Sequence, residues 1–234
     1  MKPPEAVVVD IEGTTTAIAF VHKTLFPFAR ARLDAFLAAT PHDAEVEQAI
    51  AAVQAEAPGA SVADTLRAWI DADRKAGPLK LIQGRIWRQG FEDGTLKGHV
   101  YPDVAPALRA WHAGGVRLAV YSSGSEEAQR LLFGHSVEGD LGRLFTDFLD
   151  TRIGPKRETA SYIAIARRLA LPREKILFLS DVVEELEAAE GAGLRVCQLV
   201  RPEDGTSPTA LYRTAPDFTA VARMIGLPLP AAVS

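Results

Sequence analysis

The sequence predicts an α/β protein with a doubly wound parallel sheet, and three observations support this. The run Ala6-Val7-Val8-Val9 is apolar throughout, as expected of a strand that is covered on both faces. From residue 104 onward, short apolar runs alternate with helical patterns, which is typical of parallel strands joined by right-handed crossovers. Residues 18–98 contain helical patterns but no strand. We therefore expect a core of residues 1–17 and 99–234, with a helical cap of residues 18–98 inserted after the first strand.

Composition limits the classes of function. The chain has 234 residues, 47% hydrophobic and 24% charged, with a net charge of −4, so neither nucleic acid nor an anionic membrane surface is an expected partner. No apolar run has transmembrane length and no signal-peptide core follows Met1, which favours a cytoplasmic enzyme. The one cysteine, Cys197, lies in an apolar run, which excludes a disulfide framework and predicts a small buried residue.

The predicted cap contains four helical stretches. The ordinary alternative is that these helices simply cover the sheet, but about 80 residues exceed what one crossover needs. Breaks at Pro58-Gly59 and Gly77-Pro78 separate the stretches, and Ser61 is a candidate N-cap with Asp64 three residues later. The expected helices span about 23–39 and 43–57, and two more follow, one after Ser61 that carries Leu66, Trp69 and Ile70 and one that runs from Leu79 through Trp87.

The predicted core continues with alternating helices and strands. The tail from Pro202 to Ser234 contains four prolines after its first residue and is expected to be loop-rich, without a functional interpretation. The expected elements are helix 104–112, strand 116–121, helix 125–133, strand 145–149, helix 158–170, strand 175–180, helix 182–192 and strand 194–200.

The first strand ends in two carboxylates, Asp10 and Glu12, followed by Gly13. Carboxylates at the mouth of a buried strand repel each other, and a divalent cation or phosphate chemistry would relieve that repulsion. The glycine permits a tight turn and lets backbone N–H groups approach an anion. The ordinary explanation is a strand-end turn capped by aspartate, which is common. The motif alone does not decide between these.

Three later strands also deliver polar side chains at their carboxyl ends, where ligands of parallel sheets bind. Each has an ordinary explanation, because serine and aspartate are common N-caps and a loop lysine is usually solvated. All four sets on consecutive strands are better explained by a phosphoryl site, in which hydroxyls and a lysine hold the anion and carboxylates hold a cation. The three later sets, which join Asp10 and Glu12 of the first strand, are Ser122-Ser123-Gly124-Ser125, Gly154-Pro155-Lys156, and Ser180-Asp181 with Glu184 and Glu185.

These motifs resemble the four motifs of the haloacid dehalogenase superfamily of phosphohydrolases. Within it, the chain is most similar to the enolase-phosphatase family of methionine salvage, over nearly its whole length and including the predicted cap. The superfamily usually has aspartate where this chain has Glu12, and the enolase-phosphatase family has glutamate there. The matching stretches are Asp10 to Thr15, Phe20-Val21, Thr24 to Phe28, Gln83 to Trp87, Gly94 to Tyr101, Tyr121 to Ser125, Leu131 to Gly134, Gly154 to Lys156 and Phe178 to Asp181.

The resemblance implies roles for individual residues. Asp10 would attack phosphorus to form an aspartyl-phosphate that water hydrolyses. One Mg²⁺ per chain would be held by Asp10, Glu12 and Asp181, with Glu12 ligating through either its carboxylate or its carbonyl. Glu12 would serve as acid/base if its side chain is not a ligand. The remaining roles are phosphoryl binding by Ser122, Ser123 and Lys156, and orientation of metal-bound water by Glu184 or Glu185.

The family's substrate is a small phosphorylated diketone, 2,3-diketo-5-methylthiopentyl-1-phosphate. It would be enolised and then dephosphorylated to 1,2-dihydroxy-3-keto-5-methylthiopentene. Glu12, His22 and Lys80 are hypotheses for the base that enolisation needs, and the cap would shield the methylthio tail. We also expect a monomer, by resemblance. Two alternatives remain: another small-molecule phosphatase of the superfamily, and a receiver-like phospho-acceptor module without turnover.

Overall fold

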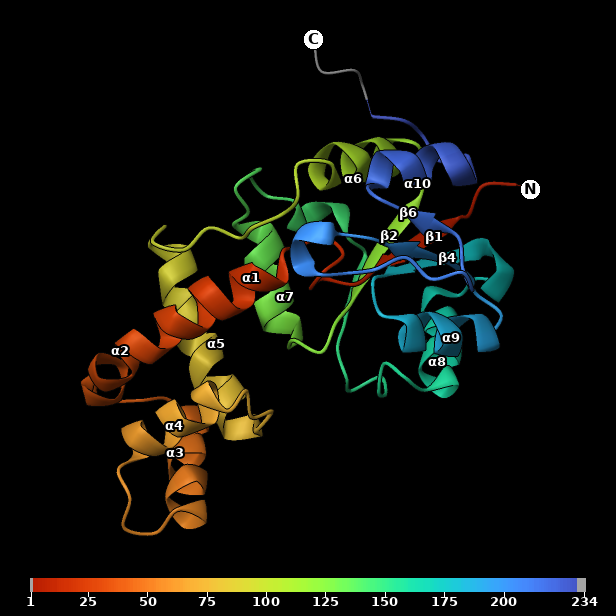
Figure 1. Ribbon diagram of the computed structural model, residues 1–234. Helices are drawn as coiled ribbons and strands as arrows, with labels where there is room; N and C mark the ends of the chain where they lie inside the picture. Colours follow the sequence, from red (N-terminus) through yellow and green to blue (C-terminus); the bar gives the residue numbers. More distant parts are fainter. Residues whose placement is uncertain (1, 231–234) are drawn as a thin grey trace. The chain divides into compact units, whose positions relative to one another are not determined.

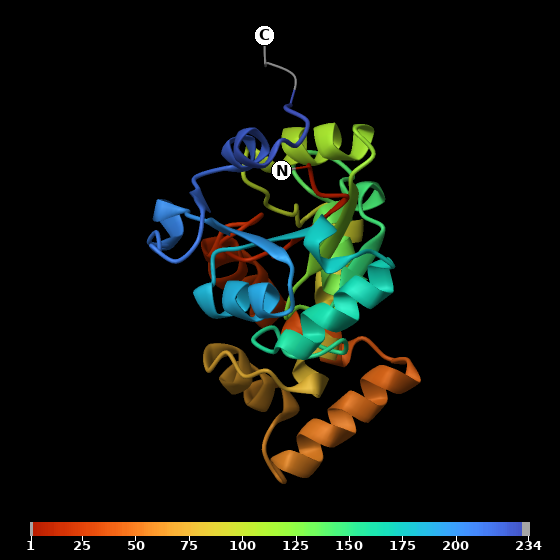
Figure 2. The ribbon, with the colours of Figure 1, turned by 90° about the vertical axis from the view of Figure 1, so that its right-hand side faces the viewer.

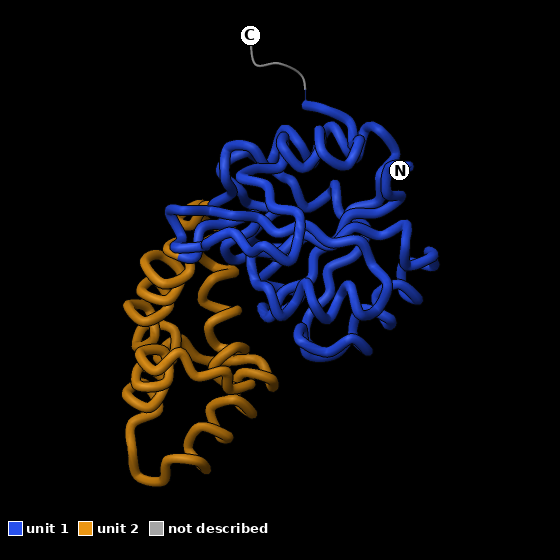
Figure 3. Tube along the Cα trace, turned by 45° about the vertical axis from the view of Figure 1, so that its right-hand side comes forward, with its two compact units in different colours: residues 1–18, 98–234 blue, residues 19–97 orange. Residues whose placement is uncertain are grey.

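The computed structural model describes residues 2–230, so Met1 and residues 231–234 of the predicted tail lie outside the described residues. The chain divides into two compact units (Figure 3). Unit 1 consists of residues 1–18 and 98–234, and unit 2 of residues 19–97. These divisions fall one residue from the predicted boundaries of core and cap.

Unit 1 is built on a parallel sheet that, within residues 2–230, has six strands in the order β3-β2-β1-β4-β5-β6. The predicted fold class is therefore confirmed. Figure 1 labels β1, β2, β4 and β6. The central strands are apolar and buried, as their sequences predict. The strands are β1 (Ala6–Val9), β2 (Arg117–Tyr121), β3 (Asp147–Leu149), β4 (Ile176–Ser180), β5 (Arg195–Leu199) and β6 (Thr214–Ala215).

The strand order reverses beside β1. The chain passes from β1 to β2 and β3 on one side, and then returns to place β4 on the other side of β1. Val9 pairs with Val120 of β2 and with Leu179 of β4, so the three strands end at the same level. The carboxyl ends of β1 and β4 thus flank a topological switch point, where open α/β sheets bind their ligands.

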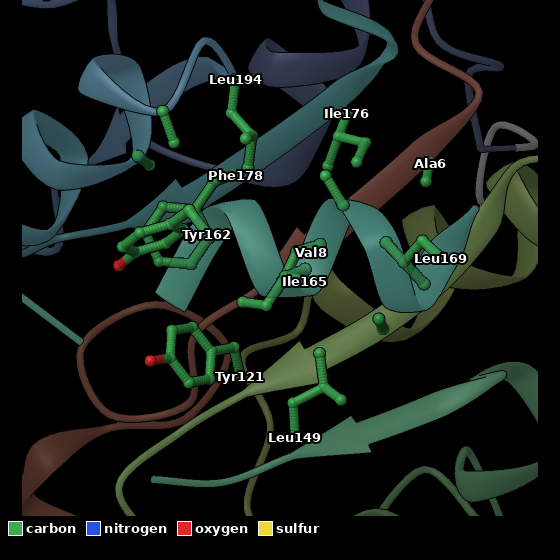
Figure 4. Packing of buried hydrophobic residues seen from close by; sticks show 14 of the residues in the cluster. Ala6, Val8, Tyr121, Leu149, Tyr162, Ile165, Leu169, Ile176, Phe178 and Leu194 are labelled. Atoms are coloured by element: carbon green, nitrogen blue, oxygen red, sulfur yellow. The ribbon is translucent and has the colours of Figure 1, made fainter. Parts of the chain in front are cut away.

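Helices cover both faces of the sheet (Figures 1 and 2). On one face, Ile165 and Leu169 of α8 pack with Val8 and Phe178 in a continuous hydrophobic cluster (Figure 4). On the other face lie α6 and α10, whose Trp111 and Phe218 rings stack 5.2 Å apart. The helices of unit 1 are α6 (Val104–Ala113), α7 (Glu126–Gly134), α8 (Thr159–Leu169), α9 (Val183–Gly191) and α10 (Phe218–Ile225).

The tail differs from its prediction. Pro202 onward contains the sixth strand and α10, whose Phe218, Val221, Ala222 and Ile225 are buried. Asp217 caps this helix by accepting the Ala220 N–H, and Gly226 ends it at φ 81°. A two-residue strand and an eight-residue helix among prolines are too short for a periodic pattern to reveal.

Unit 2 is entirely helical within the described residues. Its core joins Leu33, Val53, Leu66 and Ile82, one from each of its longer helices. Ser61 is an N-cap, as predicted, but the Asp64 carboxylate pairs with Arg67. One turn of π-helix, Val21–Leu25, was not predicted. The helices are α1 (Ile18–Phe20), which begins in unit 1, and α2 (Phe26–Ala38), α3 (Ala44–Glu56), α4 (Val62–Asp71) and α5 (Gly77–Glu92).

The two chain crossings between the units are tied together on the side of unit 1. The Thr16 hydroxyl donates to the His99 carbonyl at 2.7 Å, and the Ala17 N–H donates to His99 Nδ1 at 3.2 Å. Acceptance at Nδ1 places the His99 proton on Nε2. Burial lowers the pKa of His99, which favours this neutral form. None of the described helices combines the length and apolarity needed to span a bilayer.

Candidate active site

The end of β1 holds Asp10 in a fixed orientation. Asp10 is buried, its N–H donates to the Leu179 carbonyl at 2.9 Å, and its Oδ1 accepts the Ile11 N–H at 2.7 Å. The chain then turns back at Gly13, where φ is 71°. The Ile11 carbonyl accepts three backbone N–H groups, from Thr14, Thr15 and Thr16. The nucleophile proposed from sequence is therefore presented by a closed, buried turn.

Lys156 bridges two buried carboxylates. Its Nζ lies 2.6 Å from Asp10 Oδ1 and 2.7 Å from Glu185 Oε2. Burial alone would lower the pKa of Lys156, but the charges of Asp10 and Glu185 outweigh burial and raise it. Ser180 Oγ lies 3.0 Å from Glu185 Oε2 and 3.3 Å from Asp10 Oδ2. Segments far apart in the sequence thus converge on one ion cluster.

Three hydroxyls hold the loop that carries Lys156. Tyr121 donates to the Gly154 carbonyl at 2.9 Å, Ser161 to that of Pro155 at 2.7 Å, and Tyr162 to that of Lys156 at 2.7 Å. No pattern in the sequence indicates these contacts. Tyr162 lies in the predicted helix 158–170, where the spacing of apolar residues indicates only a buried face; it is fully buried there, and its hydroxyl reaches the loop.

Asp181 lies over the turn of β1. Thr14 Oγ1 accepts the Asp181 N–H at 3.1 Å and lies 3.4 Å from Asp181 Oδ1. A Cβ at Gly13 would lie 2.4 Å from Asp181 Oδ2, so only glycine leaves room for this carboxylate. Burial, followed by the charge of Asp10, raises the pKa of Asp181 to about 6. The carboxylates of Asp10 and Asp181 therefore lie close enough for their charges to repel each other.

The two glutamates after Asp181 have different surroundings. Glu185 is buried beside Lys156. Burial and, as a smaller effect, the charge of Asp10 raise the pKa of Glu185 to about 7. Glu184 is exposed. The structure thus brings one of the two candidate metal-orienting glutamates into the cluster.

The predicted phosphoryl serines lie at the end of the neighbouring strand, β2. Ser122 is buried and its Oγ accepts the Gly124 N–H at 3.2 Å, whereas Ser123 is exposed. Ser125 is the N-cap of α7, which is the ordinary role foreseen for it. Ser122 and Ser123 stay predictions as phosphoryl ligands. Glu12, half-buried beside Gly13, stays a prediction as metal ligand and acid/base.

The donor set at this site suits magnesium. Within residues 2–230 no group of three or more His, Cys, Asp or Glu side chains is arranged to hold a metal. Mg²⁺, however, is typically bound by one or two carboxylates, with waters and substrate phosphate completing the octahedron. Burial and, to a lesser extent, the charge of Asp10 raise the pKa of Asp181, and a bound cation would offset both effects. Asp10 and Asp181 therefore fit this cation.

At the switch point of the sheet, Asp10 forms an ion pair with Lys156, and Asp181 lies nearby. This arrangement is that of a hydrolase of the haloacid dehalogenase class. The sequence model of the haloacid dehalogenase-like hydrolase family matches residues 4–193 of this chain. Among individual relatives, the enolase-phosphatase E1 of Acidiphilium cryptum is 59% identical, covering 97% of this chain and 98% of that protein. The enolase-phosphatase E1 of Granulibacter bethesdensis is 54% identical, with 98% and 100% covered. The chain belongs to the enolase-phosphatase E1 family and is a phosphatase.

Solved structures share the fold of this chain. The UTR4 protein of Saccharomyces cerevisiae superposes with a TM-score of 0.77 at 30% identity, covering 92% of this chain and 98% of that one. CbbY from Rhodobacter sphaeroides, solved in complex with phosphate, has a TM-score of 0.62 at 20% identity, with 96% and 100% covered. At that identity the second likeness supports the fold alone.

Proposed function

We propose that the chain converts 2,3-diketo-5-methylthiopentyl-1-phosphate to 1,2-dihydroxy-3-keto-5-methylthiopentene and phosphate. The observation that carries this proposal is the contact of one buried ammonium, Lys156 Nζ, with Asp10 and Glu185 at the switch point of the sheet. Family membership indicates the substrate, and the cluster indicates the phosphatase half of the reaction. A monomeric state and a cytoplasmic location are proposed on the same family resemblance.

Asp10 is the proposed nucleophile. A carboxylate is a weak nucleophile, so its orientation and the neutralisation of nearby charge must supply most of the rate. The Ile11 N–H and Lys156 Nζ both bind Oδ1, which fixes the carboxylate plane. Attack on phosphorus forms an Asp10 acyl phosphate and breaks the bond to the enol oxygen. Water then attacks the acyl phosphate and regenerates the carboxylate.

Lys156 is the proposed phosphoryl ligand and charge compensator. An ammonium has three N–H donors, and Asp10 and Glu185 take two of them, which leaves the third to a phosphoryl oxygen. The hydroxyls of Tyr121, Ser161 and Tyr162 hold the loop, so the ammonium needs little rearrangement as charge develops. Ser122 and Ser123 are proposed to bind the other phosphoryl oxygens.

Asp10 and Asp181, with the backbone carbonyl of Glu12, are proposed to hold one Mg²⁺, so that the Glu12 carboxylate can act as acid/base. When bound, the cation supplies Lewis-acid polarisation and offsets repulsion between the phosphate and Asp10. The close approach of Asp181 to Gly13 supports the assignment. Any Cβ at position 13 would collide with the Asp181 carboxylate, so the glycine allows this carboxylate to lie next to the turn that follows Asp10. Glu185 is proposed to orient the surrounding polar groups, since it already binds Lys156 and Ser180.

Enolisation requires a base for the proton beside the carbonyl. We propose Glu12, because it adjoins the Gly13 turn in unit 1, while His22 and Lys80 lie in unit 2 and stay hypotheses. Exchange of this proton with deuterated solvent, in an Asp10→Asn background that blocks dephosphorylation, isolates the step. Loss of exchange in Glu12→Gln supports Glu12, whereas undiminished exchange excludes it.

The decisive experiment measures phosphate release and enediol absorbance from the diketo phosphate, with Mg²⁺ and with chelator. We expect both signals with Mg²⁺ and neither with chelator, and no phosphate release from Asp10→Asn. Asp217→Asn is the matched control, because asparagine caps a helix as well as aspartate does and this cap serves α10. Phosphate release from other phosphoesters but not from the diketo phosphate would favour a different phosphatase of the superfamily.

A further inference from the structure

Arg201, two residues after β5, forms a buried ion pair that the proposed reaction does not use. Its side chain is 5% exposed and forms a fork with Asp103, with Nη1–Oδ1 and Nη2–Oδ2 both 2.9 Å. Nη1 also donates to the Pro216 carbonyl at 3.0 Å, just before α10. Asp103 lies immediately before α6, so the pair joins segments that are widely separated in the sequence.

The same guanidinium reaches the turn after β1. Nη2 donates to the Thr14 carbonyl at 3.1 Å, and the side chain of Thr14 accepts the Asp181 N–H at 3.1 Å. Arg201 is therefore linked to the proposed metal ligand Asp181 through hydrogen bonds to a single residue, Thr14. The neighbouring Thr15 carbonyl accepts the N–H of Tyr101 at 3.0 Å, and the guanidinium carbon lies 4.1 Å from the centre of the Tyr101 ring.

This pair is poorly suited to stability alone. Buried ion pairs are often replaced by apolar residues at no cost, because desolvation offsets their attraction. Arg201 Nε is in addition buried without a hydrogen-bond partner among the described residues, an unsatisfied donor that native structures rarely keep. The planar guanidinium makes four bonds at once, two to the Asp103 carboxylate and one to each of two carbonyls, whereas a lysine has only three donors.

We propose that Arg201 is a positioning residue for the site: through Thr14 it holds the turn after β1 in place beneath Asp181. The inference rests on the proposed function for the roles of Asp10 and Asp181. Arg201 lies one residue before the tail and also binds the Pro216 carbonyl of the tail, so the tail, which has no functional interpretation from sequence, is linked to the site through this residue.

The competing explanation is that the pair only fastens α10 to α6. It has support, because Asp103 Oδ2 also accepts the Phe218 N–H at 2.8 Å. The two explanations differ in what happens at Thr14. A purely structural pair affects global stability, whereas a positioning residue affects the turn and the Asp181 amide even when stability is restored.

The test uses the double variant Asp103→Asn/Arg201→Met in the full chain. It removes both charges together but keeps an acceptor for the Phe218 N–H, so no unpaired charge is buried. Arg201→Lys is a second variant that retains a cation opposite Asp103. The matched control is Asp147→Asn/Arg168→Met, which removes another arginine–aspartate pair of unit 1, whose Nε–Oδ1 distance is 2.9 Å.

The first measurement is amide hydrogen exchange in chelator, which does not depend on activity. Because one charged donor to the Thr14 carbonyl is lost, we expect the amides of Asp181 and Thr14 to exchange about tenfold faster or more in both Arg201 variants. The exchange rate of the Val8 amide should not change in these variants, and the control variant should show normal exchange at Asp181 and Thr14. The second is activity: kcat falls by a similar factor and the Mg²⁺ concentration for half-maximal activity rises. Normal exchange at Asp181 and normal kcat in a folded double variant would overturn the proposal.

The same experiment separates this proposal from the proposed function. If the unmodified protein releases no phosphate from the diketo phosphate, the proposed function fails. Faster exchange at Asp181 in the same series would still support the positioning role.

Discussion

Replacing Asp181 by asparagine tests whether this carboxylate is held at an energetic cost. In the structure it is largely buried, lies near the charge of Asp10, and gains one weak contact from the Thr14 hydroxyl at 3.4 Å. Asparagine keeps the shape and one acceptor oxygen but carries no charge. In the metal-free protein we therefore expect Asp181→Asn to be more stable than the unmodified chain at neutral pH.

The size and sign follow from the pKa of Asp181, which burial raises from 3.8 to about 6. The difference corresponds to about 3 kcal/mol of free energy of folding, because each pKa unit is about 1.4 kcal/mol. The folded chain binds this proton more tightly than the unfolded chain, so the cost is complete above pH 6. It disappears as pH falls toward 3.8. The advantage of the variant should be about 3 kcal/mol at pH 8 and below about 1 kcal/mol at pH 4.

Urea unfolding in chelator at several pH values measures this advantage, because carboxylates remote from residue 181 titrate equally in both proteins. Added Mg²⁺ should stabilise the unmodified protein more than the variant, since a ligand stabilises only a state that binds it. A variant less stable than the parent at pH 8, or an advantage independent of pH, would refute the reasoning.

Three further predictions concern the same cluster. Gly13→Ala should lower stability by about 1–3 kcal/mol and weaken Mg²⁺ activation, because its φ is 71° and its Cβ would lie 2.4 Å from the Asp181 carboxylate. Thermal unfolding and Mg²⁺ titration measure this. Lys156→Met should reduce kcat on the order of a hundredfold to a thousandfold by removing the cation beside Asp10; steady-state kinetics showing a nearly normal kcat would contradict its role. Tyr162→Phe, which removes the donor to the Lys156 carbonyl, should cost about 1 kcal/mol in denaturant unfolding and lower kcat while leaving substrate KM unchanged.

The residues at the strand ends were predictable from the sequence because one rule places them. Parallel strands end at a common edge, so polar residues directly after the apolar runs must meet there. Asp10 and Asp181 follow this rule directly, Lys156 reaches the same edge from the loop after β3, and the structure brings the three together. Ser180 and Glu185 complete the cluster, Glu185 having been foreseen only as one of two candidates.

Other features depend on tertiary contacts that no local pattern encodes. The Arg201–Asp103 pair spans 98 residues, and neither side chain lies in a motif. The Tyr162 hydroxyl belongs to a helix whose spacing indicates only an apolar face. The strand and helix of the tail are shorter than the windows in which periodicity is visible.

The tie between Thr16, Ala17 and His99 has a consequence for how such a protein can be re-engineered. Because the outgoing and returning chain segments are hydrogen-bonded to each other, the roughly 80-residue insertion leaves and re-enters unit 1 at adjacent points. A short turn joining residue 17 to residue 98 would close the gap without stretching β1 or β2. The insertion can therefore be exchanged for another whose ends are similarly spaced, with the sheet of unit 1 left unchanged.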